Sequence, residues 1–323
     1  MEYVDKLPPD NRDLSMFPGQ YGWPFLGKTV ELVKDTLAMC NKHYDRYGPV
    51  SRLDMVRNQR VLMCLGPEFN EAALFDPKGN FSVAGGYASS LGVLYPEGML
   101  LRDNKKHKKT RRASQPAFKT DALKTYVDML IPIQERRIQA LPIDQEFVFY
   151  DNIQETLMDV AARVFIGLDE TSPEAQRLNY LFSTINDGLV TPLPYDLPFL
   201  KFRKSLKARE ELRQFFISNI PKRRGSDAQD MFTRYCNAQD EDGEYLDDVD
   251  IDGHMAFLLF AAFDTTTSAL TNILYYLGKN PHWQEKVRAE IFNIRNEMPT
   301  FEDLSLIHIS EPTRQEAISY AVF

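Results

Sequence analysis

The stretch FAAFDTTTSAL, residues 260–270, places an aspartate and three threonines inside the most apolar part of the chain. Apolar residues come before the polar run (Phe257, Leu258, Leu259 and Phe260) and after it (Leu270, Ile273 and Leu274), which predicts a helix buried on most sides. A buried carboxylate needs a partner, a water molecule or a function. Asp264 is therefore a candidate functional residue.

Three structural readings of the same run stay open. Thr265, Thr266 and Thr267 can bond to carbonyl groups one turn earlier, Asp264 can cap a second helix, or the segment can face solvent. The functional reading rests on Ala261 and Ala262, which come one turn before Thr265 and Thr266. Small residues there leave room for a flat ligand, and an acid next to a hydroxyl is an arrangement that delivers protons.

A second candidate site is KKHKKTRR, residues 105–112. His107 and Arg111 are four residues apart, so on a helix they share a face and can bind a carboxylate group. A solvated helix face is the structural alternative. A nucleic-acid surface is not expected, because the stretch lacks interleaved aromatic residues and the chain carries a formal net charge of −8 at pH 7.

The rest of the chain predicts one mainly helical domain. Residues 29–47 form a helix, residues 50–56 and 60–65 form a hairpin, and a long helix spans about residues 249–277, capped by Asp247 or Asp248. Prolines in residues 191–199 separate two further helices, and Gly167 caps another helix. The acidic loop from residue 240 does not fit a calcium-binding pattern, and no metal-ligating residues are predicted.

The cysteines and the apolar runs bear on the compartment. Cys40, Cys64 and Cys236 form no CxxC motif, which favours a reducing compartment. The N-terminus lacks the apolar core of a signal peptide, and no run of about 18 consecutive apolar residues is present. We therefore expect a cytoplasmic protein without a membrane span.

Residues 261–266, AAFDTT, resemble the (A/G)-G-x-(D/E)-T-T motif on the long distal helix of cytochrome P450 monooxygenases. Further segments resemble this family in the same order, namely FPGQYGWPFLGKT, HKKTRRASQPAF and LGKNPHWQEKVRAEI. The resemblance covers about residues 7–303. It implies a mainly α (α+β) cytochrome P450 fold that is incomplete, with a small N-terminal β-sheet.

The resemblance also implies roles for individual residues. His107 and Arg111 would contact the propionates of haem b, while Ala261 and Ala262 would line the oxygen pocket, although the family more often has glycine at the second of these positions. Thr265 would hydrogen-bond to dioxygen and Asp264 would relay protons. The protein would be a monomeric haem monooxygenase that oxidises a small apolar substrate, with electrons from NAD(P)H delivered through a ferredoxin or a flavoprotein reductase.

One part of the family pattern is missing. A P450 needs an axial cysteine thiolate on the haem iron. The F-x-x-G-x-x-x-C-x-G loop and the E-x-x-R helix of the family are absent, and Cys40, Cys64 and Cys236 all precede the distal helix. The alternative is therefore a catalytically inactive helical fragment that cannot hold haem stably.

The last twenty or so residues, 304–323, are predicted to be a non-native tail after a partial P450 domain of residues 1–303. Permitted codons for residues 304–314 and 318–323 spell strings that resemble the two constant parts of a transposase-based sequencing-library adapter. Residues 315–317 would then span its variable index. A divergent native tail is the alternative, and neither His308 nor Arg314 is given a functional role.

Overall fold

The computed structural model describes residues 13–55, 59–76, 78–88, 90–189, 191, 195–240, 243–293 and 299–305. Nearly all of the segment predicted to be a non-native tail, residues 306–323, lies outside the described residues, as do Pro192 and Pro194. The chain forms two compact units, residues 2–82 and residues 83–319.

The N-terminal unit carries the small sheet. Its elements are β1 (Gly19–Gln20), α1 (Thr29–Lys34), α2 (Thr36–Tyr47), β2 (Val50–Met55), β3 (Gln59–Cys64) and α3 (Pro67–Phe75). The strand order is β1-β2-β3, with β1 parallel to β2 and β2 antiparallel to β3. The predicted hairpin is therefore confirmed.

The prediction of one continuous helix over residues 29–47 was wrong. The backbone of Asp35 is extended, with φ −160° and ψ 94°, so α1 ends there and α2 begins directly after it. The Asp35 carboxylate accepts a hydrogen bond from the Ala38 amide at 2.8 Å. Apolar periodicity missed this break because a capping aspartate can start a new helix without disturbing the pattern.

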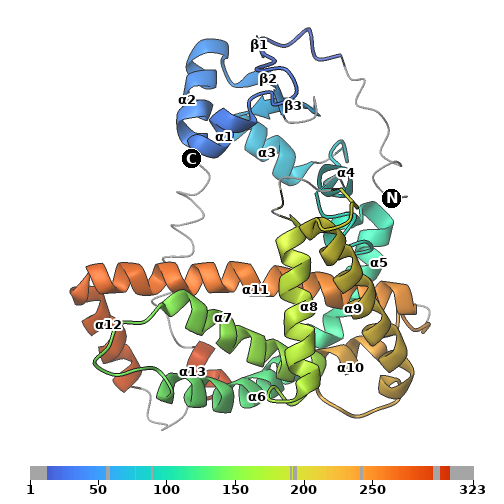
Figure 1. Cartoon of the computed structure of the whole chain (residues 1–323), viewed down its shortest axis with the longest axis vertical. Helices are drawn as coiled ribbons and strands as arrows, with labels where there is room; N and C mark the ends of the chain where they lie inside the picture. Colours follow the sequence, from blue (N-terminus) through green and yellow to red (C-terminus); the bar gives the residue numbers. More distant parts are fainter. Residues whose placement is uncertain are drawn as a thin grey trace. The chain divides into compact units, whose positions relative to one another are not determined.

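The second unit is almost wholly helical (Figure 1). Its elements are α4 (Val83–Tyr87), η3 (Met99–Leu101), α5 (Asn104–Ser114), η4 (Gln115–Phe118), α6 (Thr120–Gln139), α7 (Phe149–Val160), the π-helical turn η5 (Ala161–Ile166), α8 (Pro173–Leu189), α9 (Lys201–Arg223), α10 (Met231–Cys236), α11 (Asp248–Lys279), α12 (Pro281–Phe292) and α13 (Phe301–Ser305). The mainly α fold with a small sheet is confirmed.

Two predicted helix caps are present. Asp247 precedes α11 and accepts a hydrogen bond from the Asp250 amide at 2.6 Å. Gly167 follows η5 in the left-handed conformation, with φ 74°, which glycine adopts without steric cost. Short polar residues and glycine at these positions therefore set where the helices begin and end.

Helix α11 runs the length of this unit, with α7 along it and α8 crossing it (Figure 1). Its first half forms part of the core, where Ile251, Met255 and Ala256 are fully buried. Helices α8 and α9 pack against each other and against the same half of α11. A buried ion pair between Arg209 of α9 and Asp252 of α11, with N–O distances of 3.0 and 2.7 Å, fixes this packing.

The second half of α11 is not buried as the sequence predicted. Ile273 and Leu274 are 53% and 45% exposed, so the expectation of burial on both sides of the polar run was wrong for the later side. An apolar pattern shows that a face needs cover, but not which segment provides it. Within the described residues, α12 lies beside this half, and apolar side chains such as Leu277 and Ile291 line a hollow between the two helices.

Among the described residues, α11 is the one helix long and apolar enough to cross a membrane, judged by length and composition alone. The sequence was not expected to contain such a helix, because it has no uninterrupted apolar run of about 18 residues. Core helices of globular proteins can share this length and composition, so these two features alone do not show that α11 crosses a membrane.

Candidate functional site

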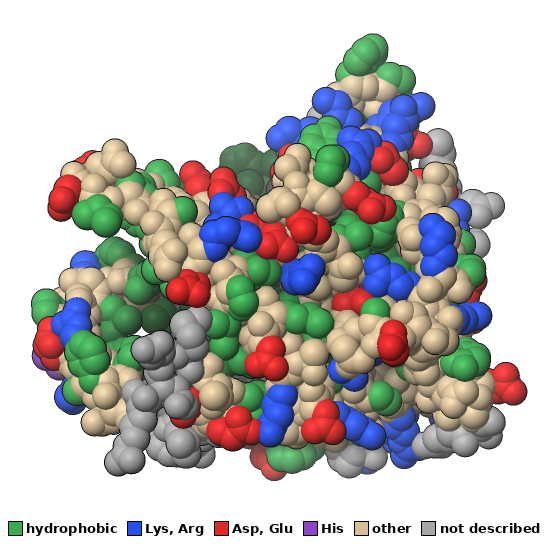
Figure 2. Space-filling view, turned by 90° about the horizontal axis from the view of Figure 1, so that it is seen from below, with side chains coloured by type: hydrophobic (Ala, Val, Ile, Leu, Met, Phe, Trp, Pro, Cys, Tyr) green, Lys and Arg blue, Asp and Glu red, His purple; other side chains and the backbone are tan. Residues whose placement is uncertain are grey.

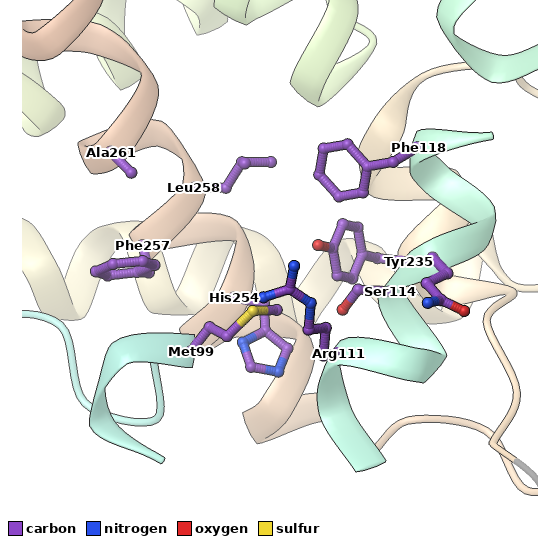
Figure 3. A pocket seen from close by; sticks show the side chains of 10 residues that line it. Met99, Arg111, Ser114, Phe118, Tyr235, His254, Phe257, Leu258 and Ala261 are labelled. Atoms are coloured by element: carbon purple, nitrogen blue, oxygen red, sulfur yellow. The ribbon is translucent and has the colours of Figure 1, made fainter. Parts of the chain in front are cut away.

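A cavity of about 390 Å³ lies beside the first half of α11 (Figure 3). Five segments line it: η3, α5, η4, α10 and α11. The lining side chains are Met99, Arg111, Ser114, Gln115, Phe118, Tyr235, His254, Phe257, Leu258 and Ala261. Elements from widely separated parts of the sequence thus line the cavity together.

The cavity has an apolar part and a polar end. Phe257, Leu258 and Ala261 project from α11, and Phe118 faces Leu258 across the space (Figure 3). At the polar end, Arg111 of α5 and His254 of α11 both line the cavity (Figure 3). An apolar pocket with a few convergent polar groups is typical of a site for an organic ligand.

His254 is the most unusual polar residue of the cavity. It is 3% exposed, and neither ring nitrogen has a hydrogen-bond partner among the residues that the structure describes. Burial lowers the pKa of His254 to about 4, and the nearby positive charge of Arg102 adds to this effect. The imidazole is therefore neutral at pH 7.

An ion-pair network holds the polar end in place. Arg102 is buried and donates to Thr110 Oγ1 at 2.7 Å and to Asp250 Oδ2 at 2.9 Å, and it also pairs with Glu97 at 3.1 Å. These bonds tie the segment before α5 to the start of α11. Arg102 and its hydrogen bonds hold the pKa of Asp250 below its usual value, although burial opposes this.

The loop before η3 also lies in close contact with the backbone of α11. A Cβ atom on Gly253 would lie 2.8 Å from the carbonyl oxygen of Pro96 and 2.8 Å from the Glu97 Cβ. Only glycine lets the loop before η3 lie directly on α11 at this point. A larger residue in place of Gly253, directly before His254, would therefore push this loop away from α11.

The polar run lies on the same helix but outside the cavity lining. Asp264 is in the interior of α11, so the reading in which it caps a second helix is wrong. Thr265 Oγ1 donates to the Ala261 carbonyl at 2.6 Å, and Thr267 Oγ1 donates to the Phe263 carbonyl at 2.9 Å. The back-bonding interpretation therefore holds for two of the three threonines.

Asp264 belongs to a short chain of polar contacts. Asn186 of α8 donates to Asp264 Oδ2 at 3.5 Å and accepts a hydrogen bond from the Tyr95 hydroxyl. The fully buried Tyr95 ring stacks on Phe260, with 4.7 Å between ring centroids. Partial burial raises the pKa of Asp264 above the usual 3.8, which favours its protonated form.

The structure brings together some of the predicted site residues and not others. Arg111 and Ala261 line the cavity, whereas His107, Ala262, Asp264 and Thr265 are not among its lining residues. Sequence reasoning missed His254, Tyr95 and Asn186. The available signal for His254 was a histidine in the apolar first half of the long helix, one turn before Leu258.

The basic stretch on α5 is largely a solvated helix face. Lys106 pairs with Glu97 at 2.7 Å, and Lys109 pairs with Asp240 at 2.8 Å. On the face shown in Figure 2, Lys and Arg side chains are interspersed with Asp and Glu. Within the part of the chain that the structure describes, no group of three or more His, Cys, Asp or Glu side chains is placed to hold a metal ion.

A long polar-centred helix beside a cavity that an arginine from a second helix also lines defines a mainly helical protein with a pocket suited to an organic ligand. The family model for cytochrome P450 matches residues 17–317, which include the first part of the segment predicted to be non-native. The chain belongs to the cytochrome P450 family.

Individual relatives are more distant. A Mycobacterium tuberculosis protein named cytochrome P450 136 is 28% identical over 287 residues, which are 88% of this chain and 58% of the relative. The beta-amyrin 28-monooxygenase CYP716A378 of Saponaria officinalis is 26% identical over 304 residues, covering 86% of this chain and 59% of the relative. This chain therefore spans about three fifths of the curated relatives that it matches.

A solved structure shares the fold. The retinoic acid-bound cyanobacterial CYP120A1 superposes with a TM-score of 0.75 at 24% identity, covering 89% of this chain and 66% of that chain. At this identity, the similarity establishes the architecture. The fold predicted from the polar run and its neighbouring segments is therefore confirmed.

Proposed function

We propose that this chain forms the distal part of a haem-dependent monooxygenase that inserts one oxygen atom of dioxygen into an apolar organic substrate. The observation that carries the proposal is the cavity in which Arg111 of α5 and Ala261 of α11 line a common space. These are two of the residues that the family resemblance assigns to the haem. They lie 150 residues apart in the sequence, and the fold brings them together.

The cavity fits one end of a haem group. Haem b is a flat apolar ring that carries two carboxylates, and the cavity offers apolar walls with a guanidinium and a buried imidazole among its lining groups. Arg111 and Ala261 would hold the group, and His107 would contribute from the same face of α5. When bound, haem supplies the dioxygen activation that no amino-acid side chain provides.

The chain's own residues would handle protons. Asp264 is partly exposed, so its carboxyl can exchange a proton with solvent, and its raised pKa makes the protonated form accessible nearer neutral pH. Asn186 holds one carboxylate oxygen and so limits the orientations of the acid. The neighbouring Thr265 hydroxyl donates to the Ala261 carbonyl, which leaves its oxygen free to accept a hydrogen bond.

The proposed substrate is a mid-sized apolar molecule. The names of relatives and of the solved structure mention beta-amyrin, taxanes and retinoic acid, which are all largely hydrocarbon molecules. We propose that electrons come from NAD(P)H through a ferredoxin or a flavoprotein reductase, as in the family.

The alternative, an inactive helical fragment, is favoured by the state of Cys236. This is the one cysteine of the helical unit; it is fully buried, and burial raises its pKa to about 12. A protonated buried thiol is a poor ligand for iron. The exposed apolar residues on the second half of α11 also favour the inactive fragment, because a stable enzyme would bury this apolar surface.

The experiment is haem titration of the purified 323-residue chain, followed by the absorption spectrum of the reduced carbon monoxide complex. We expect saturable haem uptake that Arg111→Ala weakens about tenfold or more, since a charged hydrogen bond is lost. Lys108→Ala, an exposed cation on the same helix, is the control and should have no effect. Equal affinities of the two variants would contradict the proposed site.

The spectrum decides between the two functions for this chain. The inactive-fragment reading predicts no thiolate-type Soret band in the reduced carbon monoxide complex. The appearance of that band would show that a cysteine of this chain reaches the iron and would remove the alternative.

A further inference from the structure

His254 is the observation that the proposed function does not use. Among the described residues, the only buried side-chain nitrogen or oxygen atoms without a hydrogen-bond partner are Arg52 Nε and the two ring nitrogens of His254. Burying a polar ring without partners is unfavourable, so such a group points to a ligand or a function. The ring lines the cavity that Arg111 also lines (Figure 3).

The groups around His254 do not satisfy it. Arg102 and Asp250 bond to each other, and Arg102 also holds Thr110 and Glu97. Tyr235 lies against the ring, with 6.2 Å between the ring centroids and a tilt of 50°, but it makes no hydrogen bond to it. The network beside His254 is thus closed without it, and His254 is one of the residues that line the cavity.

The chemistry of the pair selects the ligand group. A neutral imidazole keeps one N–H donor and one acceptor nitrogen, and the adjacent guanidinium is a donor only. Two donors that line one cavity from different helices suit a carboxylate better than a neutral polar group, because a carboxylate accepts hydrogen bonds at both oxygens. The apolar walls of the rest of the cavity are suited to a flat hydrocarbon body attached to that carboxylate.

We propose that His254 donates a hydrogen bond to a propionate carboxylate of the porphyrin, from α11, beside the contact that Arg111 makes from α5. This inference rests on the proposed function and adds to it a positioning residue within the apolar half of the distal helix. A substrate with its own carboxylate would present the same chemistry, and the experiment separates the two sources.

The experiment compares protoporphyrin IX with its dimethyl ester, in which both carboxylates are blocked, by fluorescence titration of the full chain. We expect wild type to prefer the free acid, and His254→Leu to lose about tenfold or more of that preference with little change in ester binding. His254→Gln keeps an N–H donor and should recover part of the preference. His282→Leu, an exposed histidine on α12, is the matched control.

A second measurement covers the case in which a variant at this buried position fails to fold. In the wild-type chain, ring ¹⁵N resonances of His254 should shift on addition of the free acid and not on addition of the ester. Absence of that difference, or an unchanged acid preference in folded His254→Leu, would overturn the inference while leaving the haem site of Arg111 intact.

Two other outcomes would also overturn the inference. If wild type binds neither porphyrin, both the proposed function and this inference fail. If palmitate binds in a His254-dependent manner while the two porphyrins bind equally, His254 binds a substrate carboxylate. The proposal that it binds a porphyrin propionate is then wrong.

Discussion

The buried ion pair between Arg209 and Asp252 gives the sharpest stability prediction. The two side chains are 7% and 4% exposed, and the guanidinium also donates from Nε to the Leu94 carbonyl at 3.0 Å. Arg209→Met keeps much of the volume but leaves a carboxylate and a carbonyl buried without this partner. Removing one member of a buried pair costs about 3–5 kcal/mol of the free energy of unfolding.

The assay is urea unfolding followed by circular dichroism. With a denaturant slope of about 3 kcal/mol per molar, the midpoint should fall by about 1–1.7 M. The control is Arg213→Met, four residues later on α9, whose partner Glu210 lies at 2.9 Å and whose side chain is 46% exposed. Exposed pairs contribute about 0–1 kcal/mol, so this variant should unfold near the wild-type midpoint.

A double variant completes the test. Arg209→Met combined with Asp252→Leu removes both charges and should recover most of the lost stability, because no unpaired charge remains. Equal midpoints for the Arg209 and Arg213 variants would refute the reasoning, as would a double variant no more stable than Arg209→Met. The pair matters to the site because Leu94 precedes Tyr95, which contacts the Asn186 side chain that holds Asp264.

Three further predictions concern single groups. Carboxyl ¹³C NMR should give Asp264 a pKa above 3.8, and Asn186→Leu should raise it further because the ionised form loses an N–H donor; a fall would contradict the contact. The lowered pKa of His254 disfavours its protonated form in the fold, so its contribution to stability is complete above pH 6.5 and is lost as the pH falls through about 4. The difference in unfolding free energy between wild type and His254→Gln should therefore change by about 3 kcal/mol over that range, and parallel curves would disprove it. Cys236 is buried with a pKa of about 12, so mass spectrometry should find it unmodified by iodoacetamide in the native protein and modified once unfolded; rapid native labelling would contradict that burial.

Much of the local structure could be predicted from the sequence. The β2–β3 hairpin, the Asp247 cap, the Gly167 cap and the long helix all depend on residues close together in the chain. These features follow from side-chain size, backbone freedom and short-range hydrogen bonds. The break at Asp35 is the same kind of feature, and it was missed because the apolar pattern continues across it.

The candidate site divides in the same way. The sequence indicated that the polar run and the His107–Arg111 face carry chemistry, and the resemblance of several segments in the right order identified the family. It did not indicate that Arg111 and His254 would line one cavity or that Tyr95 would reach Asn186, 91 residues away. Which side chains meet across such separations depends on how whole helices pack, and periodicity does not encode the partner of a face.

The sequence by itself therefore determined the order and type of the elements, the family and the residues with reactive side chains. Tertiary structure alone decided that, among the described residues, His254 is buried without a hydrogen-bond partner, Asp264 is partly exposed and contacts an amide, and the second half of α11 is exposed. The physical reason is range: helix formation and capping act over a few residues, whereas burial, pKa shifts and ligand cavities are set by segments that only the fold brings together.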